Sequence, residues 1–155
     1  MPLITLRSAT PNDREFILSL SPILAEPIKL AWHSDAAIKM FQQAYILEML
    51  ECEKSESHTV IAEIDTQPVG FIHACKSKDE VSGEACGTIP LLAVKKEAQH
   101  SGVGKALMQE AESWARKKDY RLLHLEVFSS NTEGRGFYKA LGYGEDTINL
   151  IKELS

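Results

Sequence analysis

The sequence predicts a mixed α/β (α+β) fold in which helices flank a central, twisted, mostly antiparallel sheet. Three observations support this fold class. Short apolar or alternating segments follow one another in the middle of the chain, which predicts neighbouring antiparallel strands. Two longer segments carry apolar residues at helical spacing. Finally, an apolar run ending at Val94 is followed by a polar loop with two glycines and an amphipathic stretch, which is typical of a strand, a tight loop and a helix.

The expected elements follow the order β-α-α-β-β-β-α-β-α-β. Thr10 caps the first helix, with Pro11 in its first turn and Asp13 reaching back. The segment from Asp65 to Pro68 predicts a hairpin turn, and the almost wholly apolar segment 122–128 predicts a central strand. The other expected strands are 4–7, 59–64, 69–75, 85–94 and 147–151. The other expected helices span 38–52, the stretch after Gly104 and the stretch after Asn131. Residues 22–34 are expected to form an irregular loop.

Length and composition limit the class of protein. The chain has 155 residues, which suits a single domain over 1–155. Its net charge is −5 and no basic patch is visible, so we expect no nucleic-acid partner. No apolar run approaches 18 residues, and Met1-Pro2-Leu3 opens no signal peptide, so we expect a cytoplasmic protein without membrane contact. The three cysteines show no CxxC spacing, and we expect no metal.

The loop after Val94 predicts an anion site. It reads Gln99-His100-Ser101-Gly102-Val103-Gly104-Lys105, and its glycines permit sharp turns and close approach of a ligand. The N–H groups of the following helix are unpaired in its first turn, which suits a phosphate or pyrophosphate. Leu107 breaks the dinucleotide pattern G-x-G-x-x-G, and Ala106 breaks the Walker A pattern. What remains is Gln-x-x-Gly-x-Gly.

That pattern, together with a downstream segment, carries a family resemblance. Residues 131–143 read Asn-Thr-Glu-Gly-Arg-Gly-Phe-Tyr-Lys-Ala-Leu-Gly-Tyr. Both segments resemble the GNAT family, the Gcn5-related N-acetyltransferases, whose second segment is N-x-x-A-x-x-F-Y-x-x-x-G-F. Gly134 and Tyr143 depart from it. The two segments lie within residues 91–143, and residues 6–9 with Asp13 resemble the family's opening strand and helix.

The resemblance implies the GNAT fold and an acetyl-CoA cosubstrate without metal. The cofactor-binding residues it implies are Leu92, Ala93, Val94, Gln99, His100, Ser101, Gly102, Val103, Gly104, Lys105, Asn131 and Tyr138. The N–H of Val94 would face the thioester oxygen. Tyr138 would donate a proton to the departing thiolate, because a phenol with a pKa near 10 stays protonated at neutral pH. Asn131 has a second interpretation, since Ser130 and Glu133 form a capping box.

The general base is not evident from the sequence. Thr88 and Pro90 occupy the positions at which many family members carry a glutamate or histidine, and neither can take a proton. The candidates that remain are Glu84, which is our first choice, and His73, Glu63 and Glu126. Deprotonation of the amine through a water chain is an equal alternative.

The acceptor is expected to be a primary amine of a small molecule or peptide. Residues 22–57 and the turn at 76–83 flank the open end of the expected sheet, and Trp32, His33 and Tyr45 are candidates to line it. An alternative function is a CoA-binding sensor or regulatory protein with little turnover, because the usual carboxylate is missing. The sequence is compatible with a homodimer.

Overall fold

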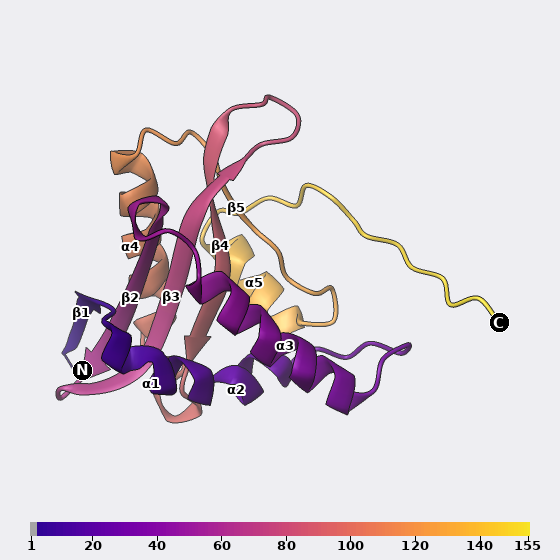
Figure 1. Ribbon diagram of the computed structural model, residues 1–155, viewed down its shortest axis with the longest axis horizontal. Helices are drawn as coiled ribbons and strands as arrows, with labels where there is room; N and C mark the ends of the chain where they lie inside the picture. Colours follow the sequence, from indigo (N-terminus) through magenta and orange to yellow (C-terminus); the bar gives the residue numbers. More distant parts are fainter. Residues whose placement is uncertain (1–2) are drawn as a thin grey trace.

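A computed structural model describes residues 3–155, which contain a five-stranded sheet in the order β1-β2-β3-β4-β5 (Figure 1). Its strands are β1 (Ile4–Ser8), β2 (Ser57–Ile64), β3 (Gln67–Lys78), β4 (Ala85–Val94) and β5 (Leu123–Leu125). Neighbouring strands are antiparallel except β4 and β5, which are parallel. The predicted mixed, mostly antiparallel sheet is confirmed. Met1 and Pro2, part of the signal-peptide expectation, lie outside the described residues.

Helices cover both faces of the sheet. On one face lie α1 (Arg14–Ser19), α2 (Ser21–Ala25) and α3 (Asp35–Leu50); on the other lie α4 (Val103–Lys117) and α5 (Thr132–Ala140) (Figure 1). Each face has its own hydrophobic core. The core under α3 includes Ile46, Phe71 and Leu91, and the core under α4 includes Leu107 and Ile72. Short 3₁₀ turns, η1 (Pro11–Asp13), η2 (Lys54–Glu56) and η3 (Lys96–Ala98), precede α1, β2 and the loop to α4.

Local sequence signals explain several element boundaries. The β2–β3 turn has positive φ at Asp65 and Thr66, the geometry of a type I′ hairpin turn. The predicted capping box forms between Thr10 and Asp13, at the start of η1. One prediction was wrong: the expected irregular loop at 22–34 begins inside α2. Pro22 is tolerated there because it lies in the helix's first turn, where its missing N–H has no intrahelical partner to lose.

A β-bulge interrupts β4 in the middle of the sheet. His73 pairs with Leu91 and Cys75 with Thr88, so Ala74 faces two residues, Ile89 and Pro90. The extra residue reverses the alternation of side chains: Leu91 joins the core under α3, whereas Ile89 lies in the core under α4. Pro90 is accommodated in an inner strand because the ladder is already disrupted at this point.

The predicted central strand at 122–128 is shorter than expected and lies at the sheet edge. Only Leu123–Leu125 pairs with β4, and β5 has no partner on its other side among residues 3–155. The segment is apolar because Leu123 and Leu125 pack against the core under α4, although their strand is at the edge. Phe128, beyond the pairing, is 40% exposed.

The predicted last strand at 147–151 does not form. Residues 144–155 have neither helix nor strand and extend away from the sheet (Figure 1). A strand is held by hydrogen bonds to a neighbour, and no strand lies beside this segment in the described part of the chain. Its apolar side chains are therefore exposed, Leu150 by 88%. From residue 3 onward, no helix is long and apolar enough to cross a bilayer.

Candidate functional site

The strands β4 and β5 separate and leave part of β4 unpaired on one side. Their pairing ends at Ile89 and Leu125, whereas β4 continues to Val94. The N–H of Lys95 donates to the Val69 carbonyl over 2.7 Å, and bonded pairs alternate along an antiparallel ladder. The peptide groups of Leu92 and Val94 therefore face away from β3, toward the gap. This open edge can accept an extended ligand that contains amide groups.

The side chain of Gln99 closes one end of this edge. Its Nε2 donates to the Val94 carbonyl oxygen over 3.0 Å. The Val94 N–H and the N–H and carbonyl of Leu92 remain directed to the gap. A ligand thioester placed there would meet one or two N–H donors, which is the requirement for stabilising an oxyanion.

The loop between β4 and α4 ends in an exposed set of backbone donors. His100 and Gly102 have φ values of +64° and +92°, and Gly102 is the N-cap of α4. Within residues 3–155 no side chain caps the helix, although the Ser101 hydroxyl donates to the Ala98 carbonyl within the loop. The first-turn N–H groups, at residues 103–105, thus remain unpaired. Together with the helix dipole they favour an anion, as the sequence predicts.

The two glycines of this loop have different roles. A Cβ on Gly102 would meet no protein atom closer than the Ile4 Cδ1 at 3.9 Å. Glycine is therefore favoured here by its positive φ, and it leaves the space above the loop open. A Cβ on Gly104 would lie 3.3 Å from Cζ of Phe137. Gly104 therefore permits close packing of α5 on the start of α4. Sequence reasoning assigned both glycines to the ligand and missed this contact.

Asn131 is the N-cap of α5. Its Oδ1 accepts from the Gly134 N–H over 2.9 Å. The predicted capping box of Ser130 and Glu133 does not form, because the Ser130 hydroxyl accepts from the Lys29 N–H over 3.2 Å and Glu133 pairs with His100 over 3.2 Å. A Cβ on Gly134 would lie 2.6 Å from the Asn131 Nδ2, so alanine at this position would require the Asn131 side chain to move.

Tyr138 projects from the middle of α5 beside the aromatic residues that hold this helix. Its ring makes edge contacts with Phe137 and Tyr143, at centroid distances of 5.2 and 6.1 Å. Burial raises the pKa of Tyr138 to about 12, so the phenol is protonated at neutral pH. Its hydroxyl makes no hydrogen bond to another of residues 3–155. It is a free donor next to the α4–α5 contact.

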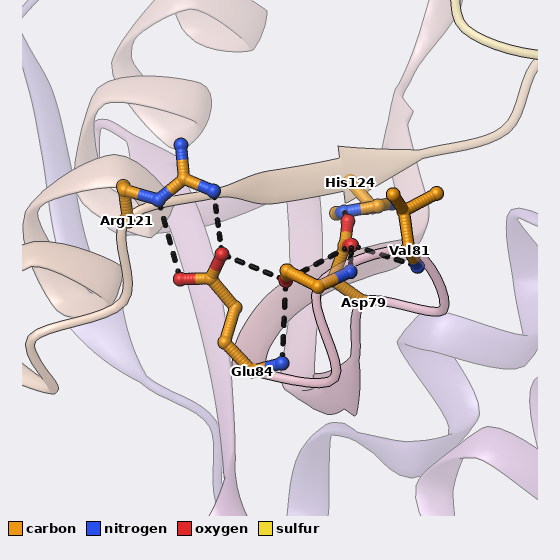
Figure 2. Close-up of polar contacts among 6 residues, drawn as sticks. Asp79, Val81, Glu84, Arg121 and His124 are labelled. Atoms are coloured by element: carbon orange, nitrogen blue, oxygen red, sulfur yellow. Dashed lines mark hydrogen bonds and ion pairs between the residues drawn. The ribbon is translucent and has the colours of Figure 1, made fainter.

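Glu84 lies in a polar network at the far end of β4 (Figure 2). Both of its carboxylate oxygens accept from Arg121, and one also accepts from the Ser82 hydroxyl over 2.8 Å. Arg121 lowers the pKa of Glu84 below its usual range. Ten residues separate Glu84 from Val94, or about 30 Å along the strand. The structure does not bring Glu84 together with the Gly loop or Tyr138.

The same network holds the β3–β4 turn against β5. Asp79 is buried and accepts from the N–H groups of Val81 and Ser82, and His124 of β5 lies 3.0 Å from its other oxygen (Figure 2). Hydrogen bonds from Ser82 are the main cause that lowers the pKa of Asp79. Through their contacts with Arg121 and His124, Glu84 and Asp79 thus attach the β3–β4 turn to β5 and the residues just before it. Sequence spacing gave no signal for this contact.

The other candidate bases are in different environments. Glu63 accepts from Arg7 over 3.0 Å, at the edge of the sheet formed by β1 and β2. His73 is buried, and desolvation lowers its pKa to about 4. Glu126 is exposed and directly follows β5, where the two strands begin to separate. Of the four candidates, Glu126 is the one at the strand gap, and it forms no ion pair with another of residues 3–155.

The loop before α3 approaches the start of α5. The contact of Ser130 with the Lys29 N–H joins the two segments. In this loop Trp32 is 37% exposed, and His33 is also exposed. Tyr45 of α3 stacks on Phe41 with ring centroids 5.8 Å apart, and its burial raises its pKa. The aromatic residues predicted to line the acceptor region thus lie on the loop and helix that cover one face of the sheet.

Comparison with known proteins identifies relatives of this chain. The family model described as the acetyltransferase (GNAT) family matches residues 23–143. Two curated relatives from Methanocaldococcus jannaschii are each named an uncharacterized N-acetyltransferase. One is 27% identical over 97 residues, covering 62% of this chain and 43% of the relative. The other is 36% identical over 106 residues, covering 60% of this chain and 64% of the relative. The chain spans less than two thirds of the length of either.

Several solved structures share the fold. A Pyrococcus furiosus protein provisionally described as an acetyl transferase has a TM-score of 0.81 at 20% identity, covering 98% of this chain and 100% of that one. An aminoglycoside N-acetyltransferase in complex with CoA has a TM-score of 0.73 at 21% identity, covering 99% and 96%. A ribosomal-protein-alanine N-acetyltransferase from Brucella melitensis has a TM-score of 0.70 at 17% identity, covering 98% and 100%.

Proposed function

This chain belongs to the GNAT family of acetyltransferases, and we propose that it moves an acetyl group from acetyl-CoA to a primary amine by direct attack on the thioester. The observation that carries the proposal is the continuity of the open edge of β4 with the Gly loop. The peptide groups of Leu92 and Val94 face the gap, and the unpaired N–H groups of α4 follow a few residues later. An amide-containing arm and a pyrophosphate joined to it match these two surfaces in order.

The residues of the site supply specific parts of the chemistry. When acetyl-CoA is bound, the N–H of Val94 or Leu92 would stabilise the negative charge on the thioester oxygen. The amine nitrogen would attack the carbonyl carbon and the carbon–sulfur bond would break, so that the sulfur leaves as a thiolate. The proton that the amine loses passes to a water chain or to one of the candidate bases. Tyr138 donates a hydrogen bond to this sulfur. Its pKa of about 12 keeps the donor proton in place throughout the neutral range.

The acceptor class is a small-molecule or peptide amine. Related structures are named for action on aminoglycosides and on a ribosomal-protein alanine, which supports an amine acceptor. The net charge of −5 suits a cationic substrate. We place the acceptor between the loop that carries Trp32 and the gap beside Glu126. The exposed apolar side chains of residues 144–155 support a homodimer, with each copy acting as a single domain.

One observation keeps a second function open. The β4 positions at which many family members carry the general base are Thr88 and Pro90 here, and neither can take a proton. A GNAT-fold protein that binds CoA but has little turnover is therefore a second candidate function. The two functions differ in one measurable property. An acetyltransferase releases free CoA thiol faster when a suitable amine is added, whereas a sensor does not.

Thermal unfolding with acetyl-CoA tests the cofactor site. A ligand that binds only the folded chain, at about 100 times its dissociation constant, adds about 2.7 kcal/mol to the free energy of unfolding. We expect Gly102→Val to lose this stabilisation, because the new side chain occupies the space above the loop. Gly83→Val is the matched control: its φ is also positive, at +76°, and it lies in the β3–β4 turn.

Both variants should be destabilised without ligand, because both place a β-branched residue at positive φ. Only Gly83→Val should keep the full acetyl-CoA shift. A full shift in Gly102→Val would contradict the assignment of the loop.

A further inference from the structure

Three soft ligand side chains meet on the face of the sheet that α3 covers. Cys52 follows the end of α3, and His73 and Cys75 lie two residues apart on β3, so they point to the same face. The sulfur atoms of the two cysteines and a ring nitrogen of His73 all lie within 4.8 Å of one another. Residues separated by more than twenty positions in the sequence thus form a compact group.

One ring nitrogen of His73 has no hydrogen-bond partner of normal geometry in the described part of the chain. The side chain is 2% exposed, and its Nδ1 is 2.7 Å from the hydroxyl of Thr59 on β2. The Nε2 is buried and makes no hydrogen bond of normal geometry to another of residues 3–155, although the Met49 backbone is close enough to favour the charged ring. A buried polar atom without a partner costs about 1–3 kcal/mol, so its retention requires an explanation.

We propose that Cys52, His73 and Cys75 bind one Zn²⁺ ion. Thiolate sulfur and imidazole nitrogen are ligands that zinc prefers, at about 2.3 and 2.0 Å. In a tetrahedral site these lengths place two sulfurs about 3.8 Å apart, so the present 4.8 Å limit requires side-chain shifts of about 1 Å or less. On binding, the two thiols lose their protons to solvent, and two thiolates balance the charge of the ion.

The surroundings supply the remaining features of a zinc site. The Thr59 hydroxyl lies 2.7 Å from Nδ1 of His73, and in the tautomer in which Nδ1–H donates to it the Nε2 lone pair is left for the metal. Cys52 is only partly buried, which gives the ion an entry path and leaves room for a water as fourth ligand. His73 and Cys75 lie on β3 and not on the open edge of β4, so this proposal does not depend on acetyl transfer.

Metal binding by the reduced full-length chain tests the proposal. The protein is reduced with a phosphine, freed of metal with a chelator, and titrated with Zn²⁺ in competition with a chromophoric chelator; Co²⁺ serves as a spectroscopic substitute. We expect one ion per chain and a thiolate-to-cobalt charge-transfer band. Cys52→Ser should lose both. Because Cys52 is partly exposed, this variant tests the site without opening the core.

A matched control and a conservative variant sharpen the result. Cys86→Ser changes the other buried cysteine, which lies outside the group, and should bind zinc like the parent chain. Thr59→Val keeps the side-chain shape and should weaken zinc binding about 10- to 100-fold, the usual effect of removing a partner of a ligating histidine. The absence of a charge-transfer band in the parent chain would overturn the proposal. So would a band that Cys52→Ser retains or Cys86→Ser abolishes.

Discussion

Substitution of Gly104 by alanine tests how α5 is positioned against the Gly loop. The new Cβ would lie 3.3 Å from Cζ and 3.5 Å from Cε1 of Phe137, which is at or inside the optimal carbon–carbon separation of about 3.5–4.0 Å. Overpacking of this kind costs about 1–3 kcal/mol. Alanine in a helix recovers about 1 kcal/mol relative to glycine. We therefore expect a net loss of about 0–2 kcal/mol in the free energy of unfolding.

A double-mutant cycle with Phe137→Leu isolates the contact. The smaller side chain removes the ring atoms that the Cβ would meet, so alanine at 104 should stabilise the Phe137→Leu background. Urea unfolding of the four proteins should give a coupling of about 1 kcal/mol or more. Gly136→Ala is the control: its Cβ would meet nothing within 4 Å, so it should add stability in either background. Effects of Gly104→Ala and Phe137→Leu that add to within about 0.5 kcal/mol would refute the contact.

Two further predictions concern titratable groups. The rise of kcat/KM with pH should persist, with modest losses of rate, in each of four variants of the candidate bases: Glu63→Gln, His73→Asn, Glu84→Gln and Glu126→Gln. A variant that loses the rising limb and also loses about 100-fold or more in rate would identify its residue as the base. Asp13 should make folding pH-dependent, because hydrogen bonds from Arg7 lower its pKa from 3.8 to about 2. The resulting stabilisation, about 2 kcal/mol, is complete above the unfolded pKa and is lost as pH falls from about 4 to about 2. Urea unfolding across this range should show a weaker pH dependence in Asp13→Asn; equal slopes in both proteins would contradict the role of the Arg7–Asp13 pair.

The sequence predicts the elements whose signals are local. The β4 strand has the predicted bounds, Ala85–Val94, and the hairpin turn at Asp65 and Thr66 is confirmed. These features depend on residues close in sequence: alternating apolar positions, turn residues and caps. The Gly loop follows for the same reason, because glycine at Gly102 supplies the positive φ at the N-cap of α4.

The features that the sequence does not predict depend on contacts between distant segments. The edge position of β5 follows from its partner, whereas its apolar composition follows from the helices that cover it. Pairing of Glu84 with Arg121 joins residues 37 positions apart. The group of Cys52, His73 and Cys75 forms because the end of α3 lies over β3. No spacing pattern encodes any of these contacts.

Release of CoA thiol from acetyl-CoA in the presence of a panel of primary amines tests the proposed activity most directly. We expect at least one amine to accelerate release by the parent chain. Tyr138→Phe should keep the acetyl-CoA thermal shift but lower kcat about 10²- to 10⁴-fold, since the ring contacts remain and only the donor is lost. Thiol release that no amine accelerates, in a chain that acetyl-CoA stabilises, would contradict the transferase function and favour a CoA-binding sensor.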